Sequence, residues 1–384
     1  MRKGLIYLAS FATAFLLAGC GVKEAEEGQI PEQSVETEIG AQGEAEAEPE
    51  QEGTKEEVTE QTSSNISMFT GLPVSEEVMK NRPLAVMFNN IKEGCPQTGI
   101  ASADLVYEAP VEGRITRLMG IFEDYKNIEK IGSIRSSRDY FVYFAMEYDA
   151  IYAHFGQATL YVGSLLNSDK VDNISGAVAG IDRPATKSFY RSEDRKAPHN
   201  VYISAEGLQK DLEKFGYRLT KKDDLKKKFQ FVSEETPYYF PYSEDATVLY
   251  PGGKETNKKN GFSKVGAKFE YNPEDQLYYR YQYGGEHIDE ATGEQLAYSN
   301  VIFQYCKGEV RDKNDYLAFG CHGNENRMIR VFTQGKMIPG VWSRMSDEEP
   351  AQYIDYEGNP ITLTPGKTWI CIIWDEYRDD VVYE

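Results

Sequence analysis

The stretch Asn81-Arg82-Pro83-Leu84-Ala-Val-Met-Phe88 contains the first clear strand of the chain, Leu84–Phe88. A short, continuous apolar run that begins just after proline is typical of a buried strand. Working outward, similar patterns predict strands at 105–108, 117–122 and 150–155, and helices at 140–147, 160–166 and 205–215. Ser136, three residues before Asp139, fits a capping box and predicts that the first of these helices begins there. The N-terminal half is therefore expected to mix helices and strands.

From Tyr238 onward the pattern changes. Tyr and Phe fall in short runs that Gly, Pro and Asn divide, as in Tyr250-Pro-Gly-Gly and Tyr271-Asn-Pro. Turn signals at intervals of about 8–12 residues between aromatic and β-branched runs indicate a β-rich half. Strands are expected at 267–271, 277–282, 300–305, 328–333, 338–344 and 368–374. With a boundary near residue 232, the expected domains are 67–231, with helices and strands, and 232–384, rich in strands.

The N-terminal residues have the pattern of a signal peptide for export. Basic residues at positions 2 and 3 precede a nearly continuous apolar run over 5–16, which ends in Leu17-Ala18-Gly19-Cys20. This is the layout of a secretory signal, and the run is too short to remain as a membrane span. The ending resembles a bacterial lipobox, which would make Cys20 the lipidated first residue of the mature chain. Residues 1–20 are thus predicted to be a lipoprotein signal peptide, and the lipid an anchor on the extracytoplasmic face of the cell membrane.

Residues 21–66 are expected to form a disordered acidic tether. Between Gly21 and Glu60 the sequence has 14 Glu and 2 Lys, without an aromatic residue or an apolar period. Such a segment cannot bury enough apolar surface to fold, and as a coil it would span roughly 40 Å. The whole chain has a formal net charge of -20. This acidity argues against nucleic acid as a partner, because nucleic-acid binding needs a basic face.

Three further segments stand out for their charged and aromatic residues. They are Tyr107-Glu108-Ala-Pro-Val-Glu112-Gly-Arg114-Ile-Thr116-Arg117, Gly132-Ser-Ile-Arg135-Ser-Ser-Arg138-Asp139, and Phe189-Tyr190-Arg191-Ser-Glu-Asp-Arg195-Lys196-Ala-Pro198-His199-Asn200. Together with His287-Ile-Asp289 and the run from Gly335 to Trp342, they resemble the YerB-like lipoprotein family over roughly residues 68–375. The resemblance implies an α+β fold of layered mixed sheets and helices, in an anchored extracytoplasmic protein of Gram-positive type. The two halves of that family are domains of unknown function, so the resemblance brings no established reaction.

The second segment is the strongest candidate for a binding site. Ser136 and Ser137 lie where a helix is expected to begin, so free backbone N–H groups and the positive end of the helix dipole would face a ligand. Arg135 and Arg138 flank them, and Arg117 lies on a nearby strand. Guanidinium groups at a helix N-terminus suit phosphate or carboxylate. We therefore expect these five residues to bind an anion; the alternative is that Asp139 caps the helix and neutralises either arginine.

Weaker candidates for catalysis are Glu108, Glu112 and His199. On one extended strand the two carboxylates would lie about 13 Å apart, which is wider than a glycosidase pair of about 5–9.5 Å. An ion pair between Glu112 and Arg117 is the more conservative expectation. His199 could act as a general base, since imidazole titrates near neutral pH.

The sequence gives no sign of a metal or cofactor site. It lacks HExxH, GxGxxG and GxxxxGK[ST] patterns, so neither a metal nor a cofactor is expected. Four cysteines follow Cys20, namely Cys95, Cys306, Cys321 and Cys371, and they allow three full disulfide pairings or a set of buried thiols.

Two classes of function remain open. The first is a tethered binding or scaffold lipoprotein that presents its body to a cell-envelope protein or an anionic cell-wall ligand. The second is an envelope hydrolase or transferase, in which the arginines hold an anionic substrate and Glu108, Glu112 or His199 moves the proton. Convergence of these residues in one cleft would favour a ligand site or an enzyme. Dispersal into separate ion pairs would favour a scaffold.

Overall fold

The computed structural model of the protein describes residues 65–176, 186–321 and 323–384. The expected signal peptide with Cys20, and the tether up to residue 64, lie outside this range. The described chain begins with a small turn, in which Val74 N donates to Asn65 O at 2.9 Å and Ile66 pairs with Pro73. The described residues belong to one compact unit.

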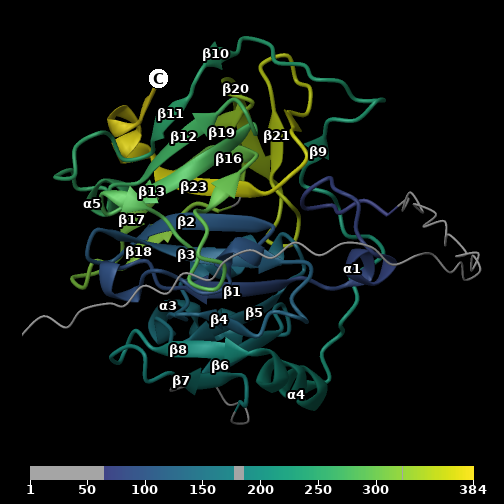
Figure 1. Ribbon diagram of the computed structural model, residues 1–384, viewed down its shortest axis with the longest axis vertical. Coiled ribbons are helices and arrows are strands. Elements are labelled where there is room, and N and C mark those ends of the chain that lie inside the picture. Colours follow the sequence, from purple (N-terminus) through teal and green to yellow (C-terminus); the bar gives the residue numbers. More distant parts are fainter. Residues whose placement is uncertain (1–64, 177–185, 322) are drawn as a thin grey trace, which may run out of the picture. The chain divides into compact units, whose positions relative to one another are not determined.

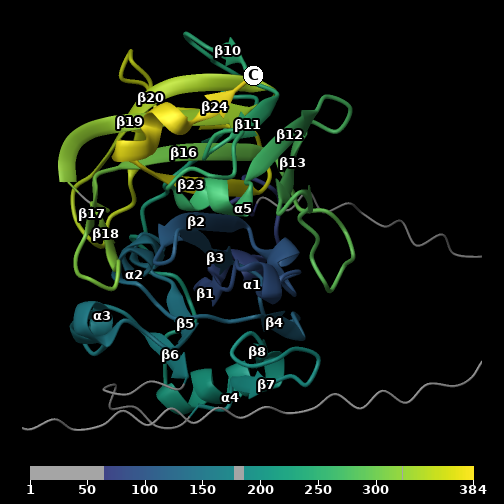
Figure 2. The ribbon, with the colours of Figure 1, turned by 90° about the vertical axis from the view of Figure 1, so that its left-hand side faces the viewer.

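One large mixed sheet organises this unit (Figure 1, Figure 2). Its order is β10-β20-β19-β16-β23-β2-β3-β1-β5-β6, and β21 pairs with β20. The strands are β1 (Leu84–Phe88), β2 (Leu105–Val111), β3 (Ile115–Phe122), β5 (Ile151–Phe155), β6 (Asn173–Gly176), β10 (Glu244–Asp245), β16 (Asn300–Cys306), β19 (Gly323–Thr333), β20 (Lys336–Arg344), β21 (Gln352–Ile354) and β23 (Thr368–Trp374). All five residues of β1 are buried, as its continuous apolar run predicts.

The middle of the sheet joins the two halves of the chain. β2 runs parallel to β23, with Leu105 opposite Thr368 and Glu108 opposite Cys371. Strands from both sides of residue 232 therefore share one hydrogen-bonded sheet. The domain boundary near that residue stays a prediction.

Smaller sheets surround the large one. A six-stranded sheet contains β11 (Val248–Tyr250), β12 (Lys268–Asn272), β13 (Leu277–Gln282), β14 (Gly285–Glu286), β15 (Ala297–Tyr298) and β24 (Val382–Tyr383). A three-stranded sheet contains β4 (Lys130–Gly132), β7 (Phe189–Arg191) and β8 (Val201–Ser204). Two pairs complete the set: β17 (Gly308–Val310) with β18 (Leu317–Phe319), and β9 (Gln230–Phe231) with β22 (Thr362–Leu363).

The helices are short. They are α1 (Glu76–Lys80), α2 (Asp139–Met146), α3 (Thr159–Leu166), α4 (Ala205–Phe215) and α5 (Gly261–Val265), with 3-10 turns η1 (Lys92–Gly94), η2 (Ile100–Ser102) and η3 (Asp375–Asp380). The capping box expected at Ser136 is wrong. α2 begins at Asp139, its N-cap residue is Arg138, and no side chain caps it.

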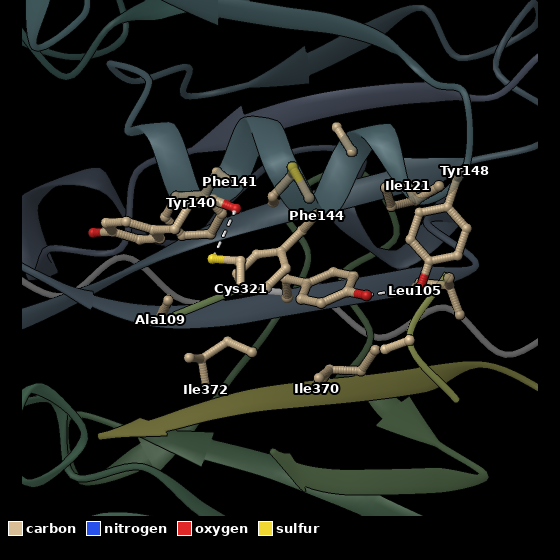
Figure 3. Packing of buried hydrophobic residues seen from close by; sticks show 14 of the residues in the cluster. Leu105, Ala109, Ile121, Tyr140, Phe141, Phe144, Tyr148, Cys321, Ile370 and Ile372 are labelled. Carbon is tan, nitrogen blue, oxygen red and sulfur yellow. Dashed lines mark hydrogen bonds between the residues drawn. The ribbon is translucent and has the colours of Figure 1, made fainter. Parts of the chain in front are cut away.

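The core lies on both faces of the large sheet. On one face, Phe141 and Phe144 of α2 pack over β2 and β23, as Figure 3 shows. The ring of Phe144 stacks on Tyr107 of β2, with the ring centroids 4.8 Å apart. The opposite face packs against the smaller sheets and α4, through residues such as Val106 and Trp369. The fold is therefore mixed α+β and rich in strands, as the sequence predicts.

Searched over the described residues alone, the protein has no helix that is both apolar enough and long enough to span a bilayer.

Candidate functional site

The candidate site lies where β1 and β5 end. These two strands are parallel, so their carboxyl ends meet at one edge of the sheet, which is where ligands bind in open α/β sheets. There the segment 134–137 inserts between them. Arg135 N donates to Met87 O, and Phe155 N donates to Arg135 O, both at 3.1 Å. Ser137 N then donates to Gly156 O at 3.0 Å. This backbone pairing brings Arg135 and its neighbours to the edge of the sheet.

Arg138 is neutralised by Glu112, which lies at the turn between β2 and β3. The Nε and Nη2 atoms of Arg138 donate to the two carboxylate oxygens of Glu112, each at 2.7 Å. The expected pairing of Glu112 with Arg117 is therefore wrong, as is the expected pairing of Asp139 with a neighbouring arginine. Asp139 instead accepts from Arg311 at 2.5 Å. Both carboxylates of this region are thus already committed.

Arg117 lacks a carboxylate partner among the described residues. Its side chain is 8 % exposed, and Nη1 donates to Ser136 O at 2.7 Å. Burial, together with the smaller effect of the positive charge of Arg138, lowers the pKa of the guanidinium to about 9. Arg117 nevertheless stays protonated at neutral pH. A buried cation of this kind is costly unless something compensates it.

Arg135 is partly exposed and likewise has no carboxylate within 4 Å in the described part of the chain. Its Nη1 donates to Pro198 O at 3.4 Å. Burial and the neighbouring Arg138 lower its pKa. Arg117 and Arg138 donate to neighbouring backbone oxygens, those of Ser136 at 2.7 Å and Ser137 at 2.6 Å, and Arg135 precedes these residues in the same segment. We call these three residues the arginine site; with Glu112 paired to Arg138, two positive charges remain uncompensated.

His199 borders the arginine site. Its Nδ1 atom accepts from the Asn89 side-chain amide at 3.1 Å, which leaves the neutral ring with its proton on Nε2. Burial is the larger cause, and the charge of Arg135 the smaller one, that lowers the pKa of His199 below 6.5. A neutral His199 is therefore a potential hydrogen-bond donor next to Arg135.

The two serines contribute mainly to the architecture. Ser136 Oγ donates to Phe155 O at 3.3 Å, while Ser137 is fully buried and accepts from Tyr152 OH at 3.0 Å. Beside Ser137, Gln157 forms a parallel bridge, and its buried Oε1 atom has no hydrogen-bond partner within the described structure. The sequence analysis did not single out Gln157, and it gave Asn89 no role in this site. Only the register of the strands brings them here, and no local motif marks them.

Glu108 lies in a different place, on the other face of β2. Its carboxylate is fully buried and is bound by Arg280 Nη2 at 3.0 and 3.2 Å. It also accepts from Thr116 Oγ1 at 2.7 Å and from Trp369 Nε1 at 3.0 Å. This side chain joins β2 to β13 and β23, and the structure does not bring it to the arginine site. The three candidates for catalysis therefore have different partners: Glu108 binds Arg280, Glu112 binds Arg138, and His199 accepts from Asn89.

The described residues contain neither a cluster of metal ligands nor a disulfide bond. No group of three or more His, Cys, Asp or Glu residues in the described ranges could hold a metal ion. Cys95, Cys306, Cys321 and Cys371 are free thiols, so no disulfide joins these four. Burial raises the pKa of Cys95 and of Cys306 to about 12, so neither is a reactive thiolate at neutral pH.

The fold and these motifs define a class of protein. Residues 69–218 match the family domain described as "Protein of unknown function (DUF3048) N-terminal domain", and residues 258–370 match its C-terminal counterpart. The chain belongs to this family, and the resemblance drawn from its motifs is confirmed.

A particular relative has both a sequence and a solved structure. The chain is 29% identical over 308 residues to "Putative lipoprotein YerB" of Bacillus subtilis (strain 168). The aligned region covers 80% of this chain and 86% of that protein. It also matches the crystal structure of the YerB protein from Bacillus subtilis, with a TM-score of 0.67 and 27% identity, over 83% of this chain and 99% of that one.

Proposed function

We propose that the protein is a lipid-anchored, extracytoplasmic binding protein of the cell envelope, and that its arginine site recognises a phosphate or carboxylate group. The observation that carries this proposal is the excess of positive charge: Arg138 binds both oxygens of Glu112 and Arg311 binds Asp139, whereas neither Arg117 nor Arg135 has a carboxylate within 4 Å among the described residues. An anion between Arg117 and Arg135 would compensate both, because guanidinium groups bind such oxygens with two parallel hydrogen bonds. His199 would add a neutral donor.

The anchor supports the same reading. The lipobox-like ending at Cys20, together with a relative named as a lipoprotein, favours a protein held at the membrane by its N-terminal lipid. The acidic segment before the folded unit would then keep that unit away from an anionic bilayer. The ligand would be an envelope molecule or the charged group of an envelope protein, rather than nucleic acid.

The proposal does not extend to catalysis. Glu108 is saturated by Arg280, Thr116 and Trp369, and Glu112 is committed to Arg138. Within the described chain, the enzyme hypothesis therefore depends on His199 alone to move a proton, without either carboxylate that was expected to assist it.

The test is calorimetric titration at low salt with inorganic phosphate and, separately, with succinate. Arg135→Ala is expected to weaken binding by about 1.5–3 kcal/mol, the usual contribution of a charged hydrogen bond. Lys196→Ala is the matched control, because it removes one exposed positive charge from the neighbouring loop. A wild-type protein that binds neither probe, or two variants that lose the same affinity, would contradict the proposal.

A further inference from the structure

A cleft separate from the arginine site has Glu112 among its lining residues. It has a volume of about 250 Å³ and is bounded by four segments of the chain: the turn between β2 and β3, the residues before α5, the β17–β18 hairpin, and the passage from β23 into η3. The arginine site contributes none of its three arginines to this cleft. The two sites therefore have different walls, although Glu112 touches both.

One wall is aromatic and held in place. The rings of Trp374 and Tyr377 meet edge to face, with centroids 5.3 Å apart, and Phe319 packs edge-on against Trp374 at 6.0 Å. Gly308 lies so close to the indole that a Cβ atom there would be 2.9 Å from it, so only glycine lets the ring rest on this backbone. Val310 lies in the same cleft and is 51 % exposed. The result is a rigid apolar surface, partly open to solvent.

Basic and acidic side chains line the cleft from different segments of the chain. Arg114 comes from the β2–β3 turn and Lys259 from the segment before α5, so the basic groups lie on these two walls. Asp315 comes from the β17–β18 hairpin and Glu376 from η3, so the acidic groups other than Glu112, which pairs with Arg138, lie on the other two walls. Within the described structure, none of these four forms an ion pair within 4 Å. Opposite charges therefore face the same small space from different walls without neutralising one another.

We propose that this cleft binds an amino acid or short peptide that carries both a free amino group and a free carboxylate. Arg114 and Lys259 suit the carboxylate, Asp315 and Glu376 suit the ammonium group, and the wall of Trp374 suits an apolar side chain. A purely anionic ligand would leave the acidic wall unmatched. A neutral sugar would stack on the aromatic wall but would use neither set of charges fully.

Trp374 provides a direct readout of the cleft. The protein has three tryptophans, and Trp342 and Trp369 are only 1 % and 0 % exposed, whereas Trp374 is partly exposed. Acrylamide should therefore quench mainly Trp374. Leucylalanine is the first probe, because it has both charges and an apolar side chain. N-acetyl-leucylalanine, leucylalanine amide and chitotriose are the comparison probes.

Leucylalanine is expected to protect the full chain from quenching in a saturable way, and blocking either end of the dipeptide should weaken protection at least tenfold. Arg114→Ala and Glu376→Gln, both at exposed positions, should each weaken binding about tenfold, while Lys313→Ala on the same hairpin as Asp315 should not. Trp374→Phe should abolish the quenching signal, which confirms its source.

Three results would overturn the proposal. They are no protection by leucylalanine, equal protection by the blocked dipeptides, or protection by chitotriose alone, which would make the cleft a glycan site. None of the three arginines of the arginine site lines this cleft. A negative result with leucylalanine would therefore leave the proposed binding of phosphate at the arginine site untouched.

Discussion

Arg280 and Glu108 form an ion pair in which both side chains are fully buried, with Nη2 3.0 Å from Oε2. Arg280 lies within the C-terminal family domain, and Glu108 lies within the N-terminal one. Trp369 packs over the guanidinium, 5.2 Å from the ring centroid, and also donates to the carboxylate. The pair is thus a polar link between the two parts of the chain, set inside an apolar core.

Breaking this pair should destabilise the fold strongly. Arg280→Met leaves a buried carboxylate without its cation, which typically costs about 3–5 kcal/mol. Removing both charges, with Glu108→Gln and Arg280→Met together, should cost less than Arg280→Met alone. Urea unfolding followed by circular dichroism measures both values, with the exposed Arg378→Met as control. A double variant that is less stable than Arg280→Met would refute this account.

Removing the carboxylate of the arginine site should affect stability and binding in opposite directions. Glu112→Gln leaves Arg138, which is 8 % exposed, without its ion pair, so a loss of about 1.5–3 kcal/mol in unfolding free energy is expected. The same change raises the positive charge around Arg117 and should tighten phosphate binding. Glu206→Gln is the control, since the Glu206–Lys210 pair is exposed and such pairs contribute little. Equal stability of the two variants would show that the Glu112–Arg138 pair is not important.

His199 should report on the arginine site through its pKa. Burial and Arg135 hold this pKa below 6.5, so just below pH 6.5 the unfolded chain binds more protons than the folded one. The contribution of His199 to stability is therefore complete above pH 6.5, falls as the pH drops, and levels off below the folded pKa. Proton NMR titration of the histidine Cε1–H signals should show the His199 pKa rising in Arg135→Ala and on addition of phosphate. A pKa that neither change moves would place the anion elsewhere.

The anchor prediction concerns a residue outside the described range. Cys20→Ala should release the protein from the membrane fraction, because the lipid on Cys20 is its expected attachment. Cys95→Ala is a suitable control, since Cys95 is a free thiol within the folded unit. Fractionation followed by immunoblotting measures the result. Persistence of the Cys20 variant in the membrane fraction would mean that another feature attaches the chain.

Local patterns in the sequence predicted much of the fold. Leu84–Phe88, Leu277–Gln282 and Thr368–Trp374 appear as expected, because each is a short run bounded by turns or by proline. Ala205–Phe215 also appears as expected, with Ser204 accepting from Gly207 N and Gly216 ending the helix in a left-handed conformation. The charged run 221–228, whose length could suit a short helix, is not helical. At the end of this run Lys228 is buried and pairs with Glu147 at 2.5 Å.

The site was harder to predict, for a physical reason. Charge and residue type identified Arg117, Arg135 and Arg138; the structure places Arg117 and Arg138 at neighbouring backbone oxygens, and anion binding by the three arginines stays a prediction. Which carboxylate neutralises which arginine depends on the register of β2, β3 and the segment 134–137, and the sequence does not encode this locally. The contacts of Glu108 with Arg280 and Trp369 depend on strands that are far apart along the chain.

The parallel pairing of β2 with β23 has a consequence for folding after the export that we propose. Glu108 and Trp369 are 261 positions apart, and a secreted chain crosses the membrane from its N-terminus. Until the last strands emerge, β2 would keep an unpaired hydrogen-bonding edge, and such edges invite aggregation. Pairings this distant also fold slowly, because a long loop must close before they form. The extracellular folding machinery should therefore matter more for this protein than for a domain built from neighbouring hairpins.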